Sequence, residues 1–299
     1  MDKPMLILFD GHALIHRAFH ALPPLSVSKT GEPTGAVYGF VQMLFKVIQD
    51  YKPTHIAMAF DRPTPTFRHL EFEDYKAQRP KAPDELVRQM GRVRDVVKVF
   101  NIPIFELDGY EADDVLGTIS RQAAAEGMDT IIVTGDNDEL QLVSERAKVL
   151  LPQRGLVDSA LYGPASVSEK YGIAPEQIPD LKGLKGDQSD NIPGVPGVGE
   201  KTAAKLIQQF GGIEGIYQRI GEVTPDKLRE NLISHEAQAK QSKRLATIVT
   251  DVPIKFDLES CRASGYDRDA AVQLFRELEF FKVLNRLPAL GGMKEQVAT

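Results

Sequence analysis

The chain has 299 residues, of which 42% are hydrophobic and one is cysteine, and its formal net charge is −6. A single cysteine excludes an intrachain disulfide and a zinc site of the CxxC type, and it fits a reducing cytoplasm. No apolar run approaches the roughly 20 residues of a membrane span, and the N-terminus carries no signal-peptide pattern. The negative charge argues mildly against a nucleic-acid partner, although the placement of charges matters more than their sum.

The first half of the chain alternates between short apolar runs and amphipathic helical patterns. Short apolar runs that stop at polar residues predict buried strands, and apolar residues at helical spacing predict helices. Strands are expected at residues 5–9, 55–60, 102–106 and 130–134, with a short edge strand at 149–151, and helices at 13–22, 34–51, 85–101 and 109–126. This alternation predicts an α/β fold whose central, mainly parallel sheet is flanked by helices on both faces.

Two regions depart from this alternation. Residues 62–83 carry many charges and four prolines, which predicts an exposed excursion with one short helix. From about Tyr162 onward no strand pattern remains and helices dominate. We therefore expect an α/β core over residues 1–185, with the excursion at about 62–82. A helical region should follow over 186–290, and a tail or linker over 291–299.

Carboxylates follow three of the predicted strands and open one of the predicted helices. Asp10, Asp61 and Asp136 each come directly after a strand, and the carboxyl ends of parallel strands meet at one edge of a sheet. Glu111, Asp113 and Asp114 begin the helix at 109–126, and they can lie at that same edge. The alternative for Asp114 is an ordinary acid of the first helical turn, where the helix dipole favours negative charge.

Further acids lie near these positions, which gives nine candidates in all. Nine like charges in one cleft would raise one another's pKa values unless cations offset them. All-oxygen ligands suit Mg²⁺ or Mn²⁺, and so many carboxylates suggest two ions, as in phosphoryl chemistry. Asp138 and Asp187 have the alternative role of helix or turn caps. The nine candidates are Asp10, Asp61, Glu111, Asp113, Asp114, Asp136, Asp138, Asp187 and Asp190.

These nine acids also change the meaning of the net charge. Without them, 33 acidic residues stand against 36 basic ones, so the rest of the chain carries +3. A nucleic-acid partner then fits the charge. His12, His16 and His20 recur every four residues on one helical face, but a zinc stripe would lack an evident fourth ligand. We expect surface or cleft histidines there.

The stretch from Ile192 to Ala203 holds closely spaced prolines and glycines before an amphipathic helix. Gly197 and Gly199 leave bare backbone through which N–H groups can approach a phosphate, and the helix N-terminus adds its dipole. Lys201 and Lys205 lie on the early turns of that helix. A helix–hairpin–helix over residues 186–211 that binds the DNA backbone is therefore expected, with a plain structural hairpin as the alternative.

Taken together, these motifs resemble the 5′ nuclease (flap endonuclease) family, and within it the 5′→3′ exonuclease domain of bacterial DNA polymerase I. The resemblance covers nearly the whole chain, and all nine carboxylates match the family's motifs. One departure is Asn137, which stands where a lysine is expected. The matching stretches are 9–11, 60–61, 67–68, 75–79, 110–114, 134–138, 186–203 and 278–287.

This resemblance implies a PIN-like 5′ nuclease fold with a helical arch at about 62–82. It further implies Mg²⁺-dependent hydrolysis of phosphodiester bonds in branched, nicked or flapped DNA and in RNA-primed duplex, during replication and repair. A K⁺ ion would bind hairpin carbonyls. Lys76 and Arg79 would lie on one face of the arch helix and steady the scissile phosphate. Tyr75 would stack on a terminal base. Arg17 and Arg68 would contact phosphates, with a surface salt bridge as the alternative role of either arginine.

The remaining expectations concern partners and rival functions. We expect a cytoplasmic monomer that works with a polymerase in cis or in trans. One rival is a Mg²⁺-dependent phosphatase of small molecules, but its usual Asp-x-Asp after the first strand is absent, because Gly11 and His12 follow Asp10. The other rival is a non-catalytic binder of DNA junctions, which would leave the carboxylates unexplained.

Overall fold

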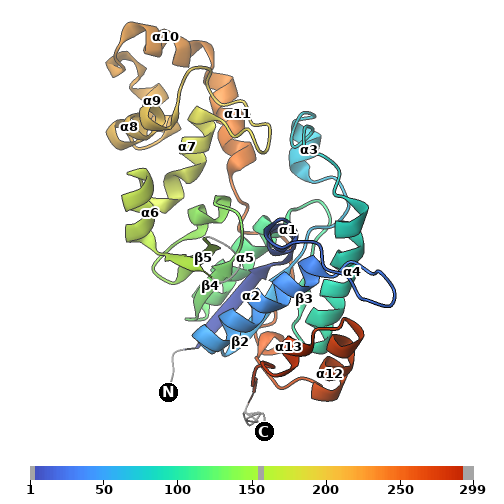
Figure 1. The fold of residues 1–299 in the computed structure, drawn as a ribbon. Helices are drawn as coiled ribbons and strands as arrows, with labels where there is room; N and C mark the ends of the chain where they lie inside the picture. The colour runs from blue at the N-terminus through green and yellow to red at the C-terminus, as the bar shows by residue number, and fades with distance from the viewer. Residues whose placement is uncertain (1–3, 154–157, 292–299) are drawn as a thin grey trace.

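A single six-stranded sheet forms the centre of the molecule (Figure 1). The computed structural model describes residues 4–153 and 158–291. The strand order is β3-β2-β1-β4-β5-β6; the first five strands are parallel and β6 is antiparallel to β5. The predicted, mainly parallel sheet is thus confirmed. The strands are β1 Met5–Asp10, β2 His55–Ala59, β3 Ile104–Phe105, β4 Asp129–Val133, β5 Ala147–Pro152 and β6 Ser159–Tyr162.

Helices cover both faces of the sheet because its strands are apolar on both sides. Successive side chains of a strand point to opposite faces. In β1, Ile7 and Phe9 enter one core cluster, whereas Leu6 and Leu8 enter another. The first cluster lies under α1 (Gly11–Ala21), α2 (Gly35–Tyr51) and α4 (Asp84–Val99), and the second under α5 (Ala112–Ala125). Continuous apolar runs therefore produce a three-layer core.

The predicted edge strand at residues 149–151 is not at an edge. It belongs to β5, which pairs with β4 on one side and with β6 on the other. The sequence pattern missed β6, whose residues are only half-buried or exposed; Leu161, for example, is 38% exposed. A strand with no buried face shows no apolar alternation.

The arch segment, residues 62–82, contains one short helix, α3 (Phe67–Glu71). The expectation that Lys76 and Arg79 share a face of this helix is wrong. Lys76 has a φ of +55°, which is incompatible with a right-handed helix, and Arg79 N–H donates to the carbonyl of Lys76 within a turn. Lys76 and Arg79 therefore reach the site from a non-helical segment that consists of turns.

The helical region stands above one end of the sheet (Figure 1). The helices on either side of the hairpin are α7 and α8, so the helix–hairpin–helix begins at residue 178 and not at 186. Gly186, with a φ of +77°, ends α7, and a Cβ at Gly194 would lie 2.1 Å from Gly186 N. The helices of this region are α6 Pro164–Tyr171, α7 Ile178–Lys185, α8 Glu200–Phe210, α9 Ile213–Gln218, α10 Asp226–Ser234 and α11 Glu236–Ala246.

The last two helices, α12 (Arg268–Glu277) and α13 (Phe281–Leu284), return to the α/β core. The ring of Phe275 on α12 lies 6.0 Å from that of Phe45 on α2, in the same core cluster. The last part of the expected region 186–290 is therefore helical but packs on the α/β core. Of the expected tail, residues 292–299 lie outside the described residues. No helix in residues 4–153 and 158–291 has the length and apolar character needed to cross a membrane.

Candidate active site

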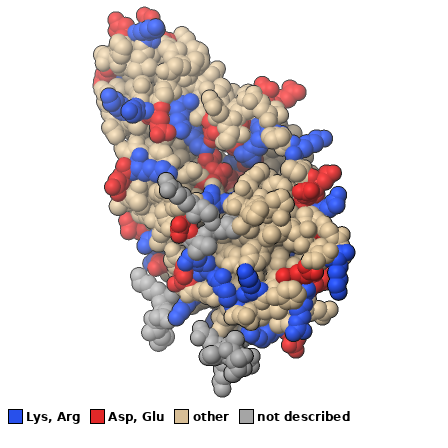
Figure 2. Space-filling model, in the orientation of Figure 1, with Lys and Arg blue, Asp and Glu red and all other residues tan. Residues whose placement is uncertain are grey.

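Acidic side chains from three neighbouring strands meet in one cleft of about 760 Å³. Asp10 ends β1, Asp61 follows β2, and Asp136 follows β4; since these strands are adjacent in the sheet, their carboxyl ends meet. Figure 2 shows acidic side chains gathered in a hollow, with Lys and Arg side chains at its rims. The α5 N-terminus points there too, and Ala112 N–H donates to Asp61 Oδ1 (2.8 Å). The predicted convergence of the strand-end aspartates therefore occurs.

The tightest cluster consists of Asp10, Asp113 and Glu139, whose carboxylate oxygens lie within 4.8 Å of one another. Burial is the main cause that raises the pKa of Asp10 to about 6, although Ala13 N–H donates to it. Burial, followed by the charges of neighbouring acids, raises the pKa values of Asp113 and Glu139 well above their ordinary range. The positive charge near the cluster is therefore too small to keep its three carboxyls ionised at their ordinary pKa values.

Glu139 was not among the nine candidates. It is fully buried on the 3₁₀ turn Asp138–Leu142, and Thr134 Oγ1 lies 3.1 Å from Glu139 Oε1 and 2.7 Å from Asp10 Oδ2. Its other oxygen, Oε2, is buried without a hydrogen-bond partner. The sequence offers one sign of a role for Glu139, its position directly after Asp138. Only the 3₁₀ turn directs the Glu139 side chain toward Asp10.

A second group of acids surrounds Lys182 on α7. Its ammonium contacts Asp138 Oδ1 and lies 2.5 Å from Asp187 Oδ2. Burial favours the neutral form of Asp187, but Lys182 outweighs it and lowers the pKa of Asp187 to about 2. Burial and the charge of Asp136 raise the pKa of Asp138 to about 7. Lys182 is a further residue that the sequence reasoning missed, because nothing in a short apolar helix marks one lysine as buried.

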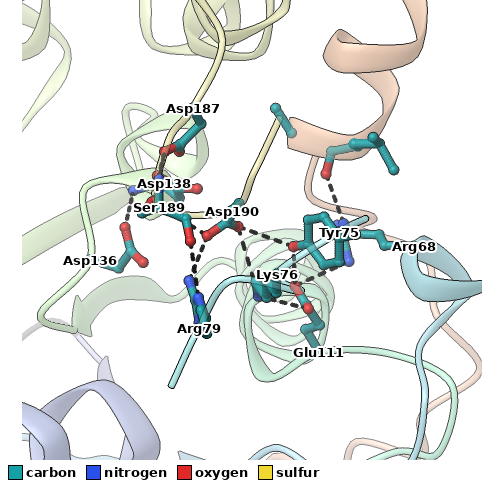
Figure 3. A network of polar contacts seen from close by, with 12 residues as sticks. Arg68, Tyr75, Lys76, Arg79, Glu111, Asp136, Asp138, Asp187, Ser189 and Asp190 are labelled. Atoms are coloured by element: carbon teal, nitrogen blue, oxygen red, sulfur yellow. Dashed lines mark hydrogen bonds and ion pairs between the residues drawn. The ribbon is translucent and has the colours of Figure 1, made fainter. Parts of the chain in front are cut away.

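Two cations of the arch segment face the acids (Figure 3). Lys76 Nζ lies 2.7 Å from Glu111 Oε1 and 3.8 Å from Asp190 Oδ2. Arg79 Nη2 lies 2.5 Å from Asp190 Oδ1. Although burial opposes ionisation of Lys76, the two carboxylates raise its pKa. Both residues line the cleft.

Three predicted site residues have other partners. Asp114 is fully buried and does not line the cleft; it forms two hydrogen bonds with Arg68 (2.7 and 2.8 Å) and caps Glu111 N–H (3.1 Å). Arg68, 2% exposed, is therefore not a phosphate contact here. Tyr75, 3% exposed, has its hydroxyl 3.1 Å from both Glu111 Oε2 and Asp190 Oδ2, so its ring does not stack on a base in this conformation.

The other predicted DNA contacts lie on accessible surface. Arg17 lines the cleft. Lys201 and Lys205 are exposed on α8. At Gly197 and Gly199 an added Cβ would meet no atom within 4 Å. Gly199 borders a second groove, of about 670 Å³, whose lining also includes Asp136, Asp138 and Asp187. This groove joins the acids to the hairpin.

The three histidines of α1 line the cleft, as expected for one helical face. His12 Nδ1 accepts a hydrogen bond from Asp61 N–H (3.0 Å), and burial lowers the pKa values of His12 and His16. Within the described residues, the compact group of potential ligands contains no histidine. The geometry gives no support to a zinc stripe.

The cluster fits a hard divalent cation. Its donors are all carboxylate oxygens, the ligand type of Mg²⁺ and Mn²⁺. The pKa values of Asp10, Asp113 and Glu139 are raised, so a bound cation would favour the ionised form of these carboxyls. The unpaired Oε2 of Glu139 gives one buried acceptor for such an ion.

Comparison with known proteins agrees with the family that the sequence motifs resemble. Two family models match, "5′-3′ exonuclease, N-terminal resolvase-like domain" over residues 5–172 and "5′-3′ exonuclease, C-terminal SAM fold" over residues 173–269. The chain is 46% identical over 295 residues to DNA polymerase I of Bacillus subtilis, covering 99% of this chain and 33% of that protein. DNA polymerase I of Mycobacterium tuberculosis is 42% identical over 289 residues, covering 95% and 32%. The chain thus spans about a third of these relatives.

Solved structures share the fold at lower identity. The T5 D15 protein co-crystallised with metal ions matches with a TM-score of 0.69 and 20% identity, covering 94% of this chain and 99% of that one. The catalytic core of Rad2 in complex with DNA substrate matches with a TM-score of 0.61 and 16% identity, covering 92% and 88%. These similarities confirm the predicted fold.

Proposed function

Because the chain belongs to the 5′-3′ exonuclease family, we propose that it is a structure-specific 5′→3′ exonuclease and flap endonuclease. Its substrates would be branched, nicked or flapped DNA and RNA-primed duplex, in replication and repair. The observation that carries this proposal is the compact trio Asp10, Asp113 and Glu139 at a cleft that shares Asp136 with the groove to the hairpin. A compact acid cluster alone is compatible with many reactions. Its connection to a hairpin that could bind a phosphate backbone favours a nucleic-acid substrate.

We propose two Mg²⁺ or Mn²⁺ ions as cofactors. One would bind the trio, and the second would bind near Asp136, Asp138 and Asp187, where it would displace the Lys182 ammonium from its contacts with Asp138 and Asp187. Divalent ions supply Lewis acidity, which favours ionisation of water and offsets negative charge on a phosphate. Asp61, Glu111 and Asp190 are further acids that line the cleft. The T5 D15 protein was co-crystallised with metal ions and the catalytic core of Rad2 with DNA substrate, and both observations support this proposal.

The chain's own cations would receive the substrate. Lys76 and Arg79 now pair with Glu111 and Asp190, and a scissile phosphate entering the cleft would offer them a competing anion. A lysine or arginine that contacts the phosphate more strongly in the transition state lowers the barrier. Arg17, which also lines the cleft, would contact the same strand.

At the hairpin, Gly197 and Gly199 would let backbone N–H groups approach phosphates of the duplex, and Lys201 and Lys205 would add charge. The proposed K⁺ ion would use backbone carbonyls of the same turn. We further propose that the protein acts as a monomer together with a polymerase, in cis or in trans, as its matched share of the polymerase relatives suggests.

The test is cleavage of a 5′-labelled flap duplex with Mg²⁺ or with a chelator. We expect a labelled fragment only with Mg²⁺, and none from Asp136→Ala, which should still bind the flap when Ca²⁺ replaces Mg²⁺. Binding without cleavage in the parent would indicate a junction-binding module. Hydrolysis of a small phosphate ester without cleavage of DNA would indicate a phosphatase.

A further inference from the structure

The proposed mechanism does not use Arg68, although its guanidinium donates four hydrogen bonds. It is 2% exposed, and it pairs with Asp114 through both terminal nitrogens (2.7 and 2.8 Å). Its Nε donates to the carbonyl of Leu245 and its Nη2 to that of Thr247, both at 2.8 Å. One side chain thus joins the arch segment, the start of α5 and the residues that end α11.

Asp114 extends this junction to the acids. Besides Arg68, it accepts hydrogen bonds from Glu111 N–H (3.1 Å) and from Val249 N–H (2.8 Å). The backbone of Glu111 is therefore fixed by the same carboxylate that holds Arg68. Glu111 in turn contacts Lys76 of the arch segment through its own carboxylate. The Arg68–Asp114 pair is therefore one residue removed from this contact.

The arch segment docks against the same parts of the chain. Tyr75 packs in a small apolar cluster with Ile192, Leu245 and Ala246. The backbone N–H of Lys76 donates to the carbonyl of Asp190 (2.9 Å). The docked segment therefore touches the chain before the hairpin and the end of α11, and the end of α11 also binds Arg68.

Helix α11 connects this junction to the hairpin. Near its middle, Gln238 Nε2 donates to the carbonyl of Gly194, and Ser242 Oγ accepts from Gly194 N–H. Its C-terminal end carries Leu245, whose carbonyl binds Arg68. A single helix, in which Leu245 comes only three positions after Ser242, therefore connects the proposed duplex site to the arch.

We propose that Arg68 is a positioning residue for the proposed nuclease reaction and acts through the arch. It fixes Lys76 against Glu111 in a defined position relative to the hairpin, so that a duplex held there presents its phosphate to Lys76. This inference rests on the proposed function. Arg68 itself touches no substrate, since Asp114 and two carbonyls occupy its nitrogens.

The test uses Arg68→Lys, which keeps the charge but cannot reproduce the two-pronged contact with Asp114 together with both carbonyls. We expect single-turnover cleavage to slow at least about tenfold, with flap affinity in Ca²⁺ changed less than about twofold. In the Lys76→Ala background the same substitution should slow cleavage less than about threefold, because the residue through which it acts is gone. Arg92→Lys is the matched control: Arg92 also makes a two-pronged contact, with Glu32, but touches no arch residue.

A second readout needs neither DNA nor activity. Hydrogen exchange at the Lys76 amide reports its bond to Asp190, and we expect exchange at least about tenfold faster in Arg68→Lys but not in Arg92→Lys. Unchanged exchange would overturn the inference, and so would an equal slowing of cleavage with and without Lys76. If the parent does not cleave at all, the proposed function fails while the exchange result still decides the docking. If Arg68→Lys does not fold, Asp114→Asn, which keeps the side chain's shape, replaces it in both measurements.

Discussion

Asp10→Asn should stabilise the metal-free protein at alkaline pH, and the size of the effect follows from the burial of this side chain. Burial, assisted by the charge of Asp61, raises the pKa of Asp10 from 3.8 to about 6 in the folded state. An acid with a raised folded pKa holds its proton more tightly in the folded state than in the unfolded one. Its contribution to the free energy of unfolding therefore falls as pH rises between about 4 and about 6.

The magnitude is set by the difference between the two pKa values, which is about two pH units. At about 1.4 kcal/mol per unit, ionised Asp10 costs the metal-free fold about 3 kcal/mol above pH 6. Asparagine removes this cost and keeps an Oδ1 acceptor for Ala13 N–H, at the expense of the charged partner of Thr134 Oγ1. A net gain of about 1–3 kcal/mol is expected at about pH 8, and a smaller gain or a loss at about pH 4.5.

The assay is urea denaturation with a chelator present, at both pH values. Asp187→Asn is the control of opposite sign: Lys182 outweighs burial and lowers the pKa of Asp187 to about 2, so its loss should destabilise the fold at both pH values. Saturating Mg²⁺ should reverse the order of parent and Asp10→Asn, because the ion stabilises the parent that binds it. A difference between parent and Asp10→Asn that is the same at both pH values would refute the reasoning.

Three further predictions concern catalysis and binding. Asp136→Ala should reduce single-turnover cleavage of a flap more than about a hundredfold, with affinity in Ca²⁺ retained; near-normal turnover would remove the two-metal account. Lys76→Ala should slow cleavage far more than it weakens binding, and a matched loss of both would make Lys76 a simple phosphate anchor. Gly199→Val should fold, since Gly199 has a φ of −88° and open space around its Cα. It should nevertheless weaken duplex binding, with a log–log salt slope shallower by about one to two units; an unchanged slope in the folded variant would show that another surface holds the duplex.

Several features could be read from the sequence because they depend on local pattern and chain topology. A buried parallel strand is apolar on both sides, so its end is visible in the sequence, and adjacent parallel strands bring those ends together. Asp10, Asp61 and Asp136 follow from these two facts alone. The glycines and prolines of the hairpin are equally local, since Gly186 and Gly194 are needed where two backbone segments touch.

The tertiary structure alone decided which charged residues face the cleft and which support it. Asp113 and Asp114 are neighbours on one helical turn, yet only Asp113 lines the cleft, because Asp114 turns back to Arg68 and to Val249, 135 residues away. Spacing along a helix gives a side chain's direction but not what lies there. Glu139 and Lys182 became visible only once a turn and a helix placed them beside other acids, since burial of a charge depends on partners that distant segments supply.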